Sequence, residues 1–234
     1  MALQILKPEW GTQCPIRGVL FDMDGLVLDS EKLYTRFWRE AAEAYGYPMT
    51  EAQSLGMRSL GQVHGQAYLE RCFGPGADYV TLRTKRIELM DAYVAQHGIA
   101  PKPGIYELMD HLHANGIAAA ITSSSPMGSI REHLAAVDLL HRFDKLCSGH
   151  DVPHGKPAPD IYLQGAAELG LRPEECLALE DSPTGILSAH RAGCLPVMIP
   201  DLDQPGEETI PLLYAKADSL TDIISLLKTQ NGHH

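Results

Sequence analysis

Two aspartates stand one residue apart directly after a short apolar run, in the segment Phe21-Asp22-Met23-Asp24-Gly25. If the apolar run is a buried strand, the turn after it aims Asp22 and Asp24 into a common crevice. Two carboxylates this close repel one another unless a cation or a shared proton relieves the repulsion. A hard cation such as Mg²⁺, which prefers oxygen ligands, suits this role. The pattern predicts a magnesium-binding turn, with a solvated turn as the alternative for so short a motif.

Three further segments carry polar groups suited to phosphate chemistry. Hydroxyls follow an apolar run in Thr122-Ser123-Ser124-Ser125-Pro126, where hydroxyls and exposed backbone N–H groups can donate to a phosphate oxygen. Lys156 lies in the tight segment Gly155-Lys156-Pro157-Ala158-Pro159, whose Gly and Pro residues fix where the lysine points. A second acid pair, Glu180 and Asp181, follows another apolar run. Taken together, these segments predict a site for a phosphorylated ligand.

Each of these segments also has an ordinary structural interpretation. Ser125 or a neighbour could be the N-cap of a helix, a position that serine often takes. Lys156 could be solvated like most lysines. Ser182 or Asp181 could cap a helix whose first turn contains Pro183. Taken singly, the motifs leave these alternatives open.

The elements that must position these residues alternate between strand and helix. The predicted strands are Val19–Phe21, Ile117–Ile121, Leu177–Leu179 and Pro196–Ile199. Helical periodicity occurs between the later strands, at Met127–Ala136, Ile161–Leu169 and Ile186–Ala192. Apolar strands alternating with helices are typical of a parallel sheet covered on both faces. In such sheets ligands bind beyond the carboxyl ends of the strands, which is where the polar segments lie.

The chain between Asp29 and the strand expected at Ile117 is too long for a simple crossover. Its predicted helices are Glu31–Ala44, a short helix after the capping-box segment Thr50-Glu51-Ala52-Gln53, Gln62–Arg71 and Tyr79–Gln96. We therefore predict an α/β protein whose Rossmann-like core, residues 15–29 and 101–230, contains an inserted all-α cap domain of four-helix type at residues 30–100. The Gly- and Pro-rich segment 98–104 is the expected return linker.

The charge balance narrows the classes of partner. The 234-residue chain has 19 Lys and Arg against 30 Asp and Glu, a net charge of −11. Residues 30–100 contain eight residues of each sign, so the negative charge belongs to the rest of the chain. An acidic chain disfavours nucleic acid and anionic membranes as partners, and no protein partner is indicated. The expected binding partner, a small phosphorylated metabolite, follows from the polar segments described above.

The cysteines indicate a reducing compartment. Their number is odd and no CxxC pair occurs, which disfavours a disulfide framework and a structural zinc site. The five residues are Cys14, Cys72, Cys147, Cys176 and Cys194. The start of the chain lacks the apolar core of a signal peptide, and no run of about 20 apolar residues occurs. We predict a cytoplasmic protein with reduced thiols.

The acid pair, the hydroxyl, the lysine and the second acid pair occur in an order that resembles the haloacid dehalogenase-like (HAD) phosphohydrolase superfamily. The resemblance covers residues 15–230. The insertion resembles the small helical cap of the subfamily that contains β-phosphoglucomutase and many sugar-phosphate phosphatases. The stretches 28–34 and 154–161 are also similar to pseudouridine-5′-phosphatases and plant glycerol-3-phosphatases.

The resemblance implies an Mg²⁺-dependent phosphatase that hydrolyses a small phosphomonoester of the sugar, polyol or nucleoside phosphate class. Asp22 would form an aspartyl-phosphate, and Asp24 would serve as general acid and then general base. Ser123 and Lys156 would bind the phosphoryl oxygens. The implied metal ligands are Asp22, Asp24 and Asp181, with Glu180 beside them.

The resemblance also implies where the substrate binds. Gly25 and Ser124 would contact it from the core. Glu31, Tyr34 and Arg58 would contact it from the cap, where the guanidinium of Arg58 suits a phosphate or a polyol. An exposed surface arginine is an equally good interpretation of Arg58, since most arginines are exposed.

Four alternatives stay in view. A phosphomutase of the β-phosphoglucomutase type is the nearest, but that enzyme has a histidine where this chain has Tyr34, which favours a phosphatase. Dehalogenases generally lack an aspartate at the position of Asp24. A phosphorylatable receiver domain uses similar residues but is about half as long and has no cap. A phosphate-binding module without turnover is disfavoured by the presence of both Asp24 and Lys156.

Overall fold

The computed structural model describes residues 3–11, 14–57, 60–201 and 204–231. The contacts within it divide the chain into two compact units, one formed by residues 1–28 and 101–234 and the other by residues 29–100. Each unit has its own buried clusters of apolar side chains. We call the first the core unit and the second the helical unit.

The core unit is built on a seven-stranded sheet with the order β1-β7-β6-β5-β2-β3-β4. The strands are β1 (Gln4–Ile5), β2 (Gly18–Phe21), β3 (Ala118–Ser123), β4 (Lys145–Ser148), β5 (Cys176–Glu180), β6 (Leu195–Met198) and β7 (Ala215–Lys216). Neighbouring strands are parallel, except that β1 pairs antiparallel with β7. The α/β class is thus confirmed, and the four predicted strands correspond to β2, β3, β5 and β6.

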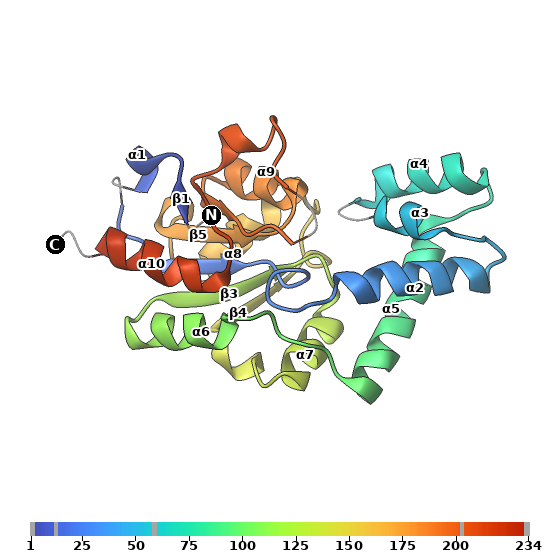
Figure 1. The fold of residues 1–234 in the computed structure, drawn as a ribbon, viewed down its shortest axis with the longest axis horizontal. Helices are drawn as coiled ribbons and strands as arrows, with labels where there is room; N and C mark the ends of the chain where they lie inside the picture. The colour runs from blue at the N-terminus through green and yellow to red at the C-terminus, as the bar shows by residue number, and fades with distance from the viewer. Residues whose placement is uncertain (1–2, 12–13, 58–59, 202–203, 232–234) are drawn as a thin grey trace. The chain divides into compact units, whose positions relative to one another are not determined.

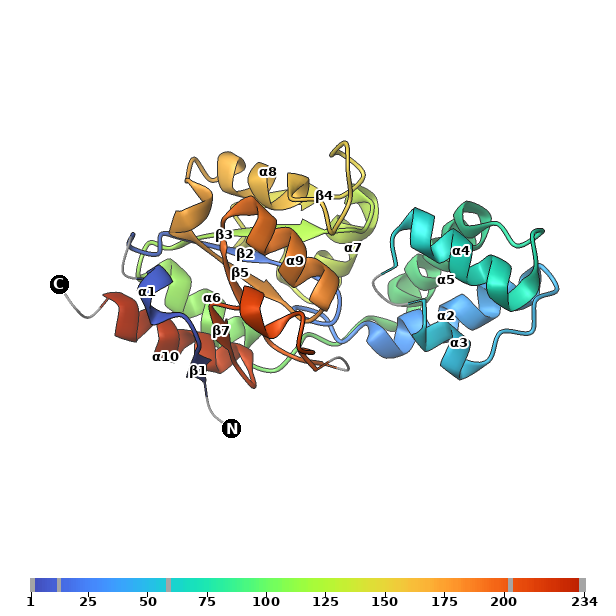
Figure 2. The ribbon, with the colours of Figure 1, turned by 90° about the horizontal axis from the view of Figure 1, so that it is seen from above.

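Helices cover both faces of this sheet (Figures 1 and 2). One face carries α8 (Asp160–Glu168) and α9 (Pro183–Ala192), and the other carries α6 (Ile105–Ala114), α7 (Met127–Ala136) and α10 (Leu220–Asn231). A short α1 (Pro8–Gly11) and the 3₁₀ turns Leu140–Arg142, Pro173–Glu175 and Ile210–Leu212 complete the unit. Because helices cover both faces, β2, β5 and β6 are buried along their whole length, which explains why their sequences are apolar apart from Glu180 at the end of β5.

The direction of the chain through the sheet reverses at β2. From β2 the chain continues outward to β3 and β4, and it then returns to the other side of β2 to form β5 and β6. Phe21 on β2 is paired with Ile121 on β3 and Leu179 on β5. The residues that follow at these three carboxyl ends therefore lie side by side, at the switch point where doubly wound sheets bind their ligands.

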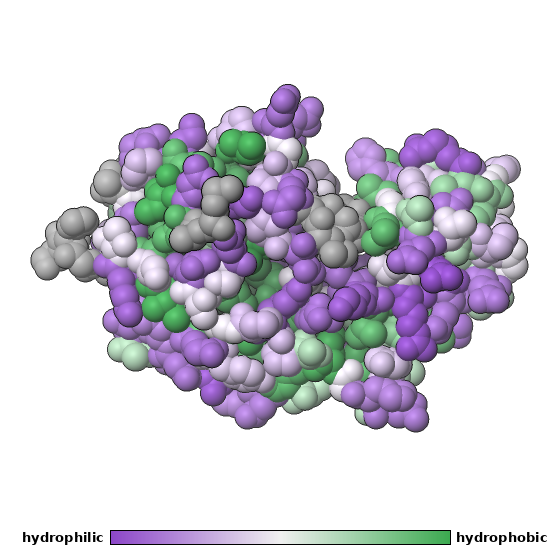
Figure 3. Space-filling model, in the orientation of Figure 1, coloured by the Kyte–Doolittle hydropathy of each residue, from purple (hydrophilic) through white to green (hydrophobic). Residues whose placement is uncertain are grey.

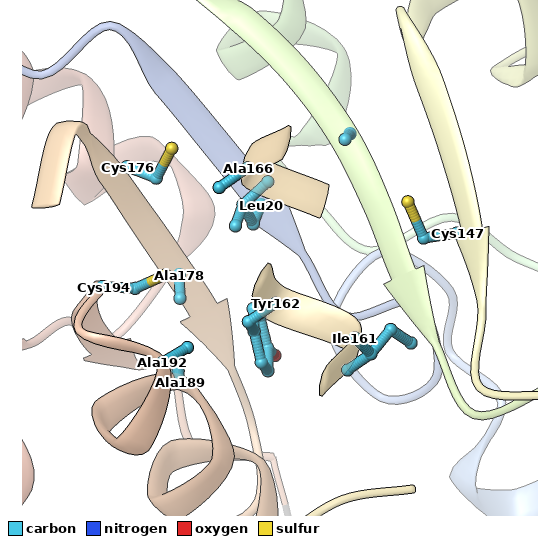
Figure 4. Close-up of a cluster of buried hydrophobic side chains, with 11 residues drawn as sticks. Leu20, Cys147, Ile161, Tyr162, Ala166, Cys176, Ala178, Ala189, Ala192 and Cys194 are labelled. Carbon is cyan, nitrogen blue, oxygen red and sulfur yellow. The ribbon is translucent and has the colours of Figure 1, made fainter. Parts of the chain in front are cut away.

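A hydrophobic cluster lies between the sheet and helices α8 and α9 (Figure 4). Its members are Leu20, Ala120, Cys147, Ile161, Tyr162, Ala166, Cys176, Ala178, Ala189, Ala192 and Cys194. Burial raises the pKa of the Cys147 thiol to about 11 and that of Cys176 to about 12. These thiols are therefore protonated at neutral pH and behave as small apolar side chains.

The helical unit contains α2 (Glu31–Ala44), α3 (Glu51–Leu55), α4 (Gln62–Phe73) and α5 (Tyr79–His97), all close to the predicted ranges. The predicted capping box begins α3: the Gln53 amide donates to Thr50 Oγ1 at 3.2 Å, and the Thr50 amide donates to Gln53 Oε1 at 2.8 Å. Two apolar clusters fill the unit, one around Trp38 and Leu82 and one around Phe37 and Met90.

Hydrophilic side chains gather over α2 on the face of the molecule shown in Figure 3. The hydropathy of α2 explains this, because Phe37, Trp38, Ala41 and Ala42 are buried while most of its exposed positions carry charged side chains. Among the described residues, no helix combines the length and the apolar character needed to span a bilayer.

Candidate active site

The loop after β2 holds the first acid pair in a tight turn. The amides of Val27 and Leu28 both donate to the carbonyl of Met23 at 3.0 Å, and the amide of Gly25 donates to the carbonyl of Leu28 at 3.0 Å. Gly25 has φ +81°, a left-handed conformation in which a side chain would be strained. This turn fixes Asp22 and Asp24 at the carboxyl edge of the sheet, as the sequence predicts.

Lys156 joins two of the carboxylates. Its Nζ donates to Asp22 Oδ1 and to Glu180 Oε1, each at 2.6 Å. The side chains of Lys156 and Glu180 are only 8% and 1% exposed. Lys156 comes from the segment before α8, whereas Asp22 and Glu180 come from the adjacent strands β2 and β5. Residues that are 134 positions apart therefore meet in one charged cluster.

Hydroxyls at the end of β3 hold the carboxylate of Asp24. Ser125 Oγ donates to Asp24 Oδ2 at 3.0 Å, and Ser123 Oγ approaches the same oxygen at 3.5 Å. The other oxygen, Asp24 Oδ1, is buried and has no hydrogen-bond partner among the described residues. Such an atom is costly to bury alone, so it marks a position where a ligand hydroxyl or water can donate.

The N-cap interpretation of Ser125 is wrong. The N-cap of α7 is Pro126, and the side chain of Ser125 bonds Asp24 instead. Its carbonyl also accepts a 2.7 Å hydrogen bond from Ser148 Oγ on β4. Ser125 thus belongs to the site, and its membership in the serine run after β3 is the signal that could have identified it.

Glu180 is enclosed by donors on every side. In addition to Lys156, Tyr162 Oη donates to Oε1 at 2.6 Å, and Ser182 Oγ donates to Oε2 at 3.1 Å. Ser182 is also the N-cap of α9, because its Oγ accepts from the amide of Gly185 at 3.1 Å, as the capping interpretation expects. A Cβ on Gly185 would lie 1.8 Å from Glu180 Oε1, so only glycine fits against this carboxylate.

The ionisable groups of the cluster shift one another's pKa values. Burial raises the pKa of Asp22 to about 8, with Lys156 acting to lower it and Glu180 and Asp24 to raise it further. Burial by itself would lower the pKa of Lys156, but Asp22 and Glu180 raise it well above its ordinary value. The lysine is therefore charged at neutral pH, whereas the ionised form of Asp22 is disfavoured until further positive charge is present.

The same carboxylates can hold a metal ion. Asp22, Glu180 and Asp181 each offer an oxygen, and the three atoms lie within 4.8 Å of one another. A set of carboxylate oxygens is the donor type that Mg²⁺ prefers. A cation bound here would also favour the ionised form of Asp22 beside Lys156. The residues present therefore fit the predicted magnesium ion.

The remaining predicted substrate residues are distributed between the two units. Ser124 is exposed beside Ser123 and Ser125 in the core unit. In the helical unit, Glu31 and Tyr34 lie in the first turn of α2, and the Arg86 guanidinium covers the Tyr34 ring at 4.3 Å. Arg58 lies outside the described residues. The roles of these residues stay predictions.

Together, the fold and the site define a class: an α/β enzyme core with an inserted helical unit and a carboxylate–lysine centre at the sheet's switch point. A family model for haloacid dehalogenase-like hydrolase matches residues 16–193. The chain belongs to this family, and it is a hydrolase. The resemblance inferred from the four motifs is confirmed.

Relatives of the chain carry phosphatase names. Hexitol phosphatase A of Escherichia coli is 32% identical over 223 residues, which cover 92% of this chain and 96% of the relative. A Drosophila melanogaster protein named Probable pseudouridine-5′-phosphatase is 33% identical over 201 residues, which cover 81% and 84%. Among solved structures, CbbY from Rhodobacter sphaeroides in complex with phosphate matches with a TM-score of 0.76 and 27% identity, covering 89% of this chain and 96% of that chain.

Proposed function

We propose that the protein is an Mg²⁺-dependent phosphatase that hydrolyses a small phosphomonoester through an aspartyl-phosphate on Asp22. The observation that carries the proposal is the cluster in which Lys156 Nζ lies 2.6 Å from both Asp22 and Glu180. A nucleophilic carboxylate beside a fixed cation, at the switch point of a parallel sheet, suits attack on a phosphoryl group.

In the first step an Asp22 carboxylate oxygen forms a bond to phosphorus, and the bond from phosphorus to the ester oxygen breaks. Attack requires Asp22 to be ionised, yet burial favours its protonated form. The hydrogen bond from Lys156 and a cation bound by the carboxylates both favour ionisation. Mg²⁺, held by Asp22, the Asp24 carbonyl and Asp181 with Glu180 beside them, would supply positive charge that neutralises the phosphoryl oxygens.

Asp24 handles the protons of both steps. Its protonated carboxyl gives a proton to the departing ester oxygen, and its carboxylate then takes one from the water that hydrolyses the aspartyl-phosphate. The bond from Ser125 to Oδ2 leaves Oδ1 without a partner among the described residues, so Oδ1 is the oxygen available to the leaving group and the water.

The phosphoryl oxygens would be bound by Ser123, by the backbone around Ser124 and by Lys156. Ser123 is fully buried at the end of β3, and the Ser125 amide donates to its Oγ at 3.1 Å. This contact orients the Ser123 hydroxyl toward the edge of the sheet. Gly25, whose left-handed backbone brings the turn close to the site, would let the substrate approach the main chain.

The substrate that we propose is a phosphorylated sugar, polyol or nucleoside. The names of the relatives point to hexitol phosphates and pseudouridine 5′-phosphate, which share a monoester on a hydroxyl-rich body. Glu31, Tyr34 and Arg58 would select among such bodies. We also propose that the protein works in the cytoplasm, because its five cysteines are free thiols.

The test replaces the nucleophile with its uncharged isostere. Asp22→Asn should abolish Mg²⁺-dependent hydrolysis of p-nitrophenyl phosphate while the circular dichroism spectrum stays that of the wild type. Asp110→Asn is the matched control. Asp110 is exposed on α6 and accepts a hydrogen bond from Arg142, so this variant should keep full turnover. An Asp22→Asn variant with wild-type turnover would refute the proposed mechanism.

A further inference from the structure

Tyr162 places a polar group in an apolar environment. Its side chain is fully buried on α8, inside the cluster that packs α8 and α9 against the sheet, and Figure 4 shows it between Ile161 and Ala178. A phenylalanine would fill this space as well, because the ring makes the apolar contacts. The hydroxyl is costly to bury unless it is bonded, so its 2.6 Å hydrogen bond to Glu180 Oε1 explains why a tyrosine is present.

The donors around Glu180 leave its carboxylate no freedom to turn. Each carboxylate oxygen can accept about two hydrogen bonds. Oε1 accepts from Lys156 Nζ and Tyr162 Oη, both at 2.6 Å. Oε2 accepts from the Oγ and the amide of Ser182, at 3.1 and 3.4 Å. Gly185 closes the remaining side, where a Cβ would lie 1.8 Å from Oε1.

A clamped Glu180 in turn fixes the position of Lys156. The ammonium lies 2.6 Å from Asp22 Oδ1 on one side and 2.6 Å from Glu180 Oε1 on the other. Nζ also lies 5.1 Å from the centroid of the Tyr162 ring. If Oε1 lost its tyrosine donor, the carboxylate could rotate, and the ammonium would follow it away from the nucleophile.

On the basis of the proposed phosphatase activity, we infer that the Tyr162 hydroxyl is a positioning group that holds Glu180, and through it Lys156, in the geometry that attack by Asp22 requires. Tyr162 itself touches neither the nucleophile nor the phosphoryl group. Its effect passes through Glu180 to Lys156, and Glu180 also lies beside Asp22 and Asp181 in the proposed metal site. The sequence alone does not indicate this positioning role, because an aromatic residue on the buried face of a helix looks like ordinary packing.

The experiment compares two buried hydroxyls in the core unit. Tyr162→Phe removes the one that bonds Glu180. Tyr214→Phe is the matched control, since Tyr214 is also fully buried and its hydroxyl accepts a 2.6 Å bond from Gln230, far from Glu180 in the chain. We expect Tyr162→Phe to lower kcat for p-nitrophenyl phosphate about tenfold with KM little changed, the size seen when a supporting hydrogen bond is removed. Tyr214→Phe should keep the wild-type kcat.

Two measurements separate positioning from packing and from metal binding. The Mg²⁺ dissociation constant of Tyr162→Phe, measured by calorimetry with the metal alone, should change much less than kcat. Glu180 lies in the proposed metal site, but its two oxygens are engaged by Lys156, Tyr162 and Ser182, so Asp22 and Asp181 would carry most of the metal binding. In a Glu180→Gln background, Tyr162→Phe should change kcat much less than in the wild type, because the two residues act as a unit. The inference is overturned if Tyr162→Phe keeps the wild-type kcat, if Tyr214→Phe loses as much, or if Mg²⁺ binding weakens in parallel with kcat.

Failure of the proposed function has a different signature. In that case the wild type itself hydrolyses no phosphomonoester with Mg²⁺. The unfolding equilibrium then tests the hydrogen bond between Tyr162 and Glu180 without any activity. Tyr162→Phe should raise the unfolding constant by about tenfold in the wild type, and by much less in the Glu180→Gln background. Equal effects of Tyr162→Phe in the two backgrounds would overturn the inference that its hydroxyl holds Glu180.

Discussion

Among the described residues, the core unit and the helical unit each bury one cationic side chain, and they accommodate its charge in different ways. Lys156, with a side chain 8% exposed, lies between the carboxylates of Asp22 and Glu180. Arg86, 5% exposed, lies over the rings of Tyr34 at 4.3 Å and Trp38 at 5.7 Å. We call these two surroundings the acid cage and the aromatic cage.

The difference reflects the two side chains. The ammonium of lysine is a compact and strongly hydrated charge, so burying it requires full negative charges and short hydrogen bonds. The planar guanidinium is weakly hydrated and can stack on aromatic faces. Arg86 Nη1 contacts Met90 Sδ at 3.7 Å, and its Nε has no hydrogen-bond partner among the described residues. The acid cage can therefore move charge and protons, whereas the aromatic cage holds a cation in place by packing.

The largest effect should come from emptying the acid cage. Lys156→Met keeps the length of the side chain but leaves Asp22 and Glu180 facing each other without a cation. We expect hydrolysis of p-nitrophenyl phosphate to fall by about 10²–10³-fold, the cost of losing one donor to a reacting phosphoryl or acyl centre. Steady-state kinetics at saturating Mg²⁺ measures this loss.

Lys145→Met is the control for Lys156→Met. Lys145 is an exposed lysine whose partner, Glu168, lies 3.4 Å away, and a surface pair of this kind contributes about 1 kcal/mol or less. Its turnover should equal that of the wild type. If both variants kept their activity, the acid cage would have no part in catalysis, and the contrast with the aromatic cage would lose its functional meaning.

The carboxylates of the acid cage were predictable from the sequence because they lie at the carboxyl ends of strands. Asp22, Ser123 and Glu180 follow apolar runs that can be identified as strands. The carboxyl ends of parallel strands meet at one edge of the sheet. The strand β4, with the sequence Lys-Leu-Cys-Ser, was missed because it is short and begins with a charge. Lys156 was still found, since the Gly and Pro residues around it mark a constrained segment.

The aromatic cage and the support of the acid cage could not be predicted in this way. In the sequence Arg86 stands among charged residues of α5, in Arg83-Thr84-Lys85-Arg86, and looks exposed. Its burial depends on the packing of α2 against α5, which brings Tyr34 and Trp38 over it. Tyr162, by contrast, looks like an ordinary core residue in the sequence. Only the fold shows that its hydroxyl reaches Glu180.

A smaller effect should come from altering the aromatic cage. Arg86→Lys keeps the charge but replaces a stacking plane with a strongly hydrated ammonium. We expect the free energy of unfolding to fall by about 2 kcal/mol, the value of a desolvated cation–π contact. Thermal unfolding followed by circular dichroism measures the loss, and hydrolysis of p-nitrophenyl phosphate well below the transition should be retained.

The matched control for this change is Arg36→Lys. Arg36 is exposed and its guanidinium lies 4.9 Å from the rings of both Phe37 and Tyr93, so its cation–π contacts are similar in distance but solvated. Contacts of this exposed kind contribute about 0.5–1 kcal/mol. Equal losses in Arg86→Lys and Arg36→Lys would show that burial adds nothing to the aromatic cage.

The smallest effect concerns a single proton of the acid cage. Burial raises the pKa of Asp22 to about 8, so in the metal-free protein this carboxyl is largely protonated at neutral pH. A cation favours the ionised form, so Mg²⁺ binding should release a proton below this pKa and release almost none well above it. The apparent Mg²⁺ affinity should therefore rise as the pH is raised toward about 8 and level off beyond it.

Calorimetry in two buffers of different ionisation enthalpy counts this proton. We expect nearly one proton released per Mg²⁺ at about pH 6.5, and a small fraction of one at about pH 9. Asp22→Asn should release far less at the lower pH, whereas Arg86→Lys should release as much as the wild type, because Arg86 contacts Tyr34, Trp38 and Met90 of its own unit. If the wild type releases no proton at the lower pH, the attraction of Lys156 outweighs burial, and Asp22 is ionised and ready to attack before the metal binds.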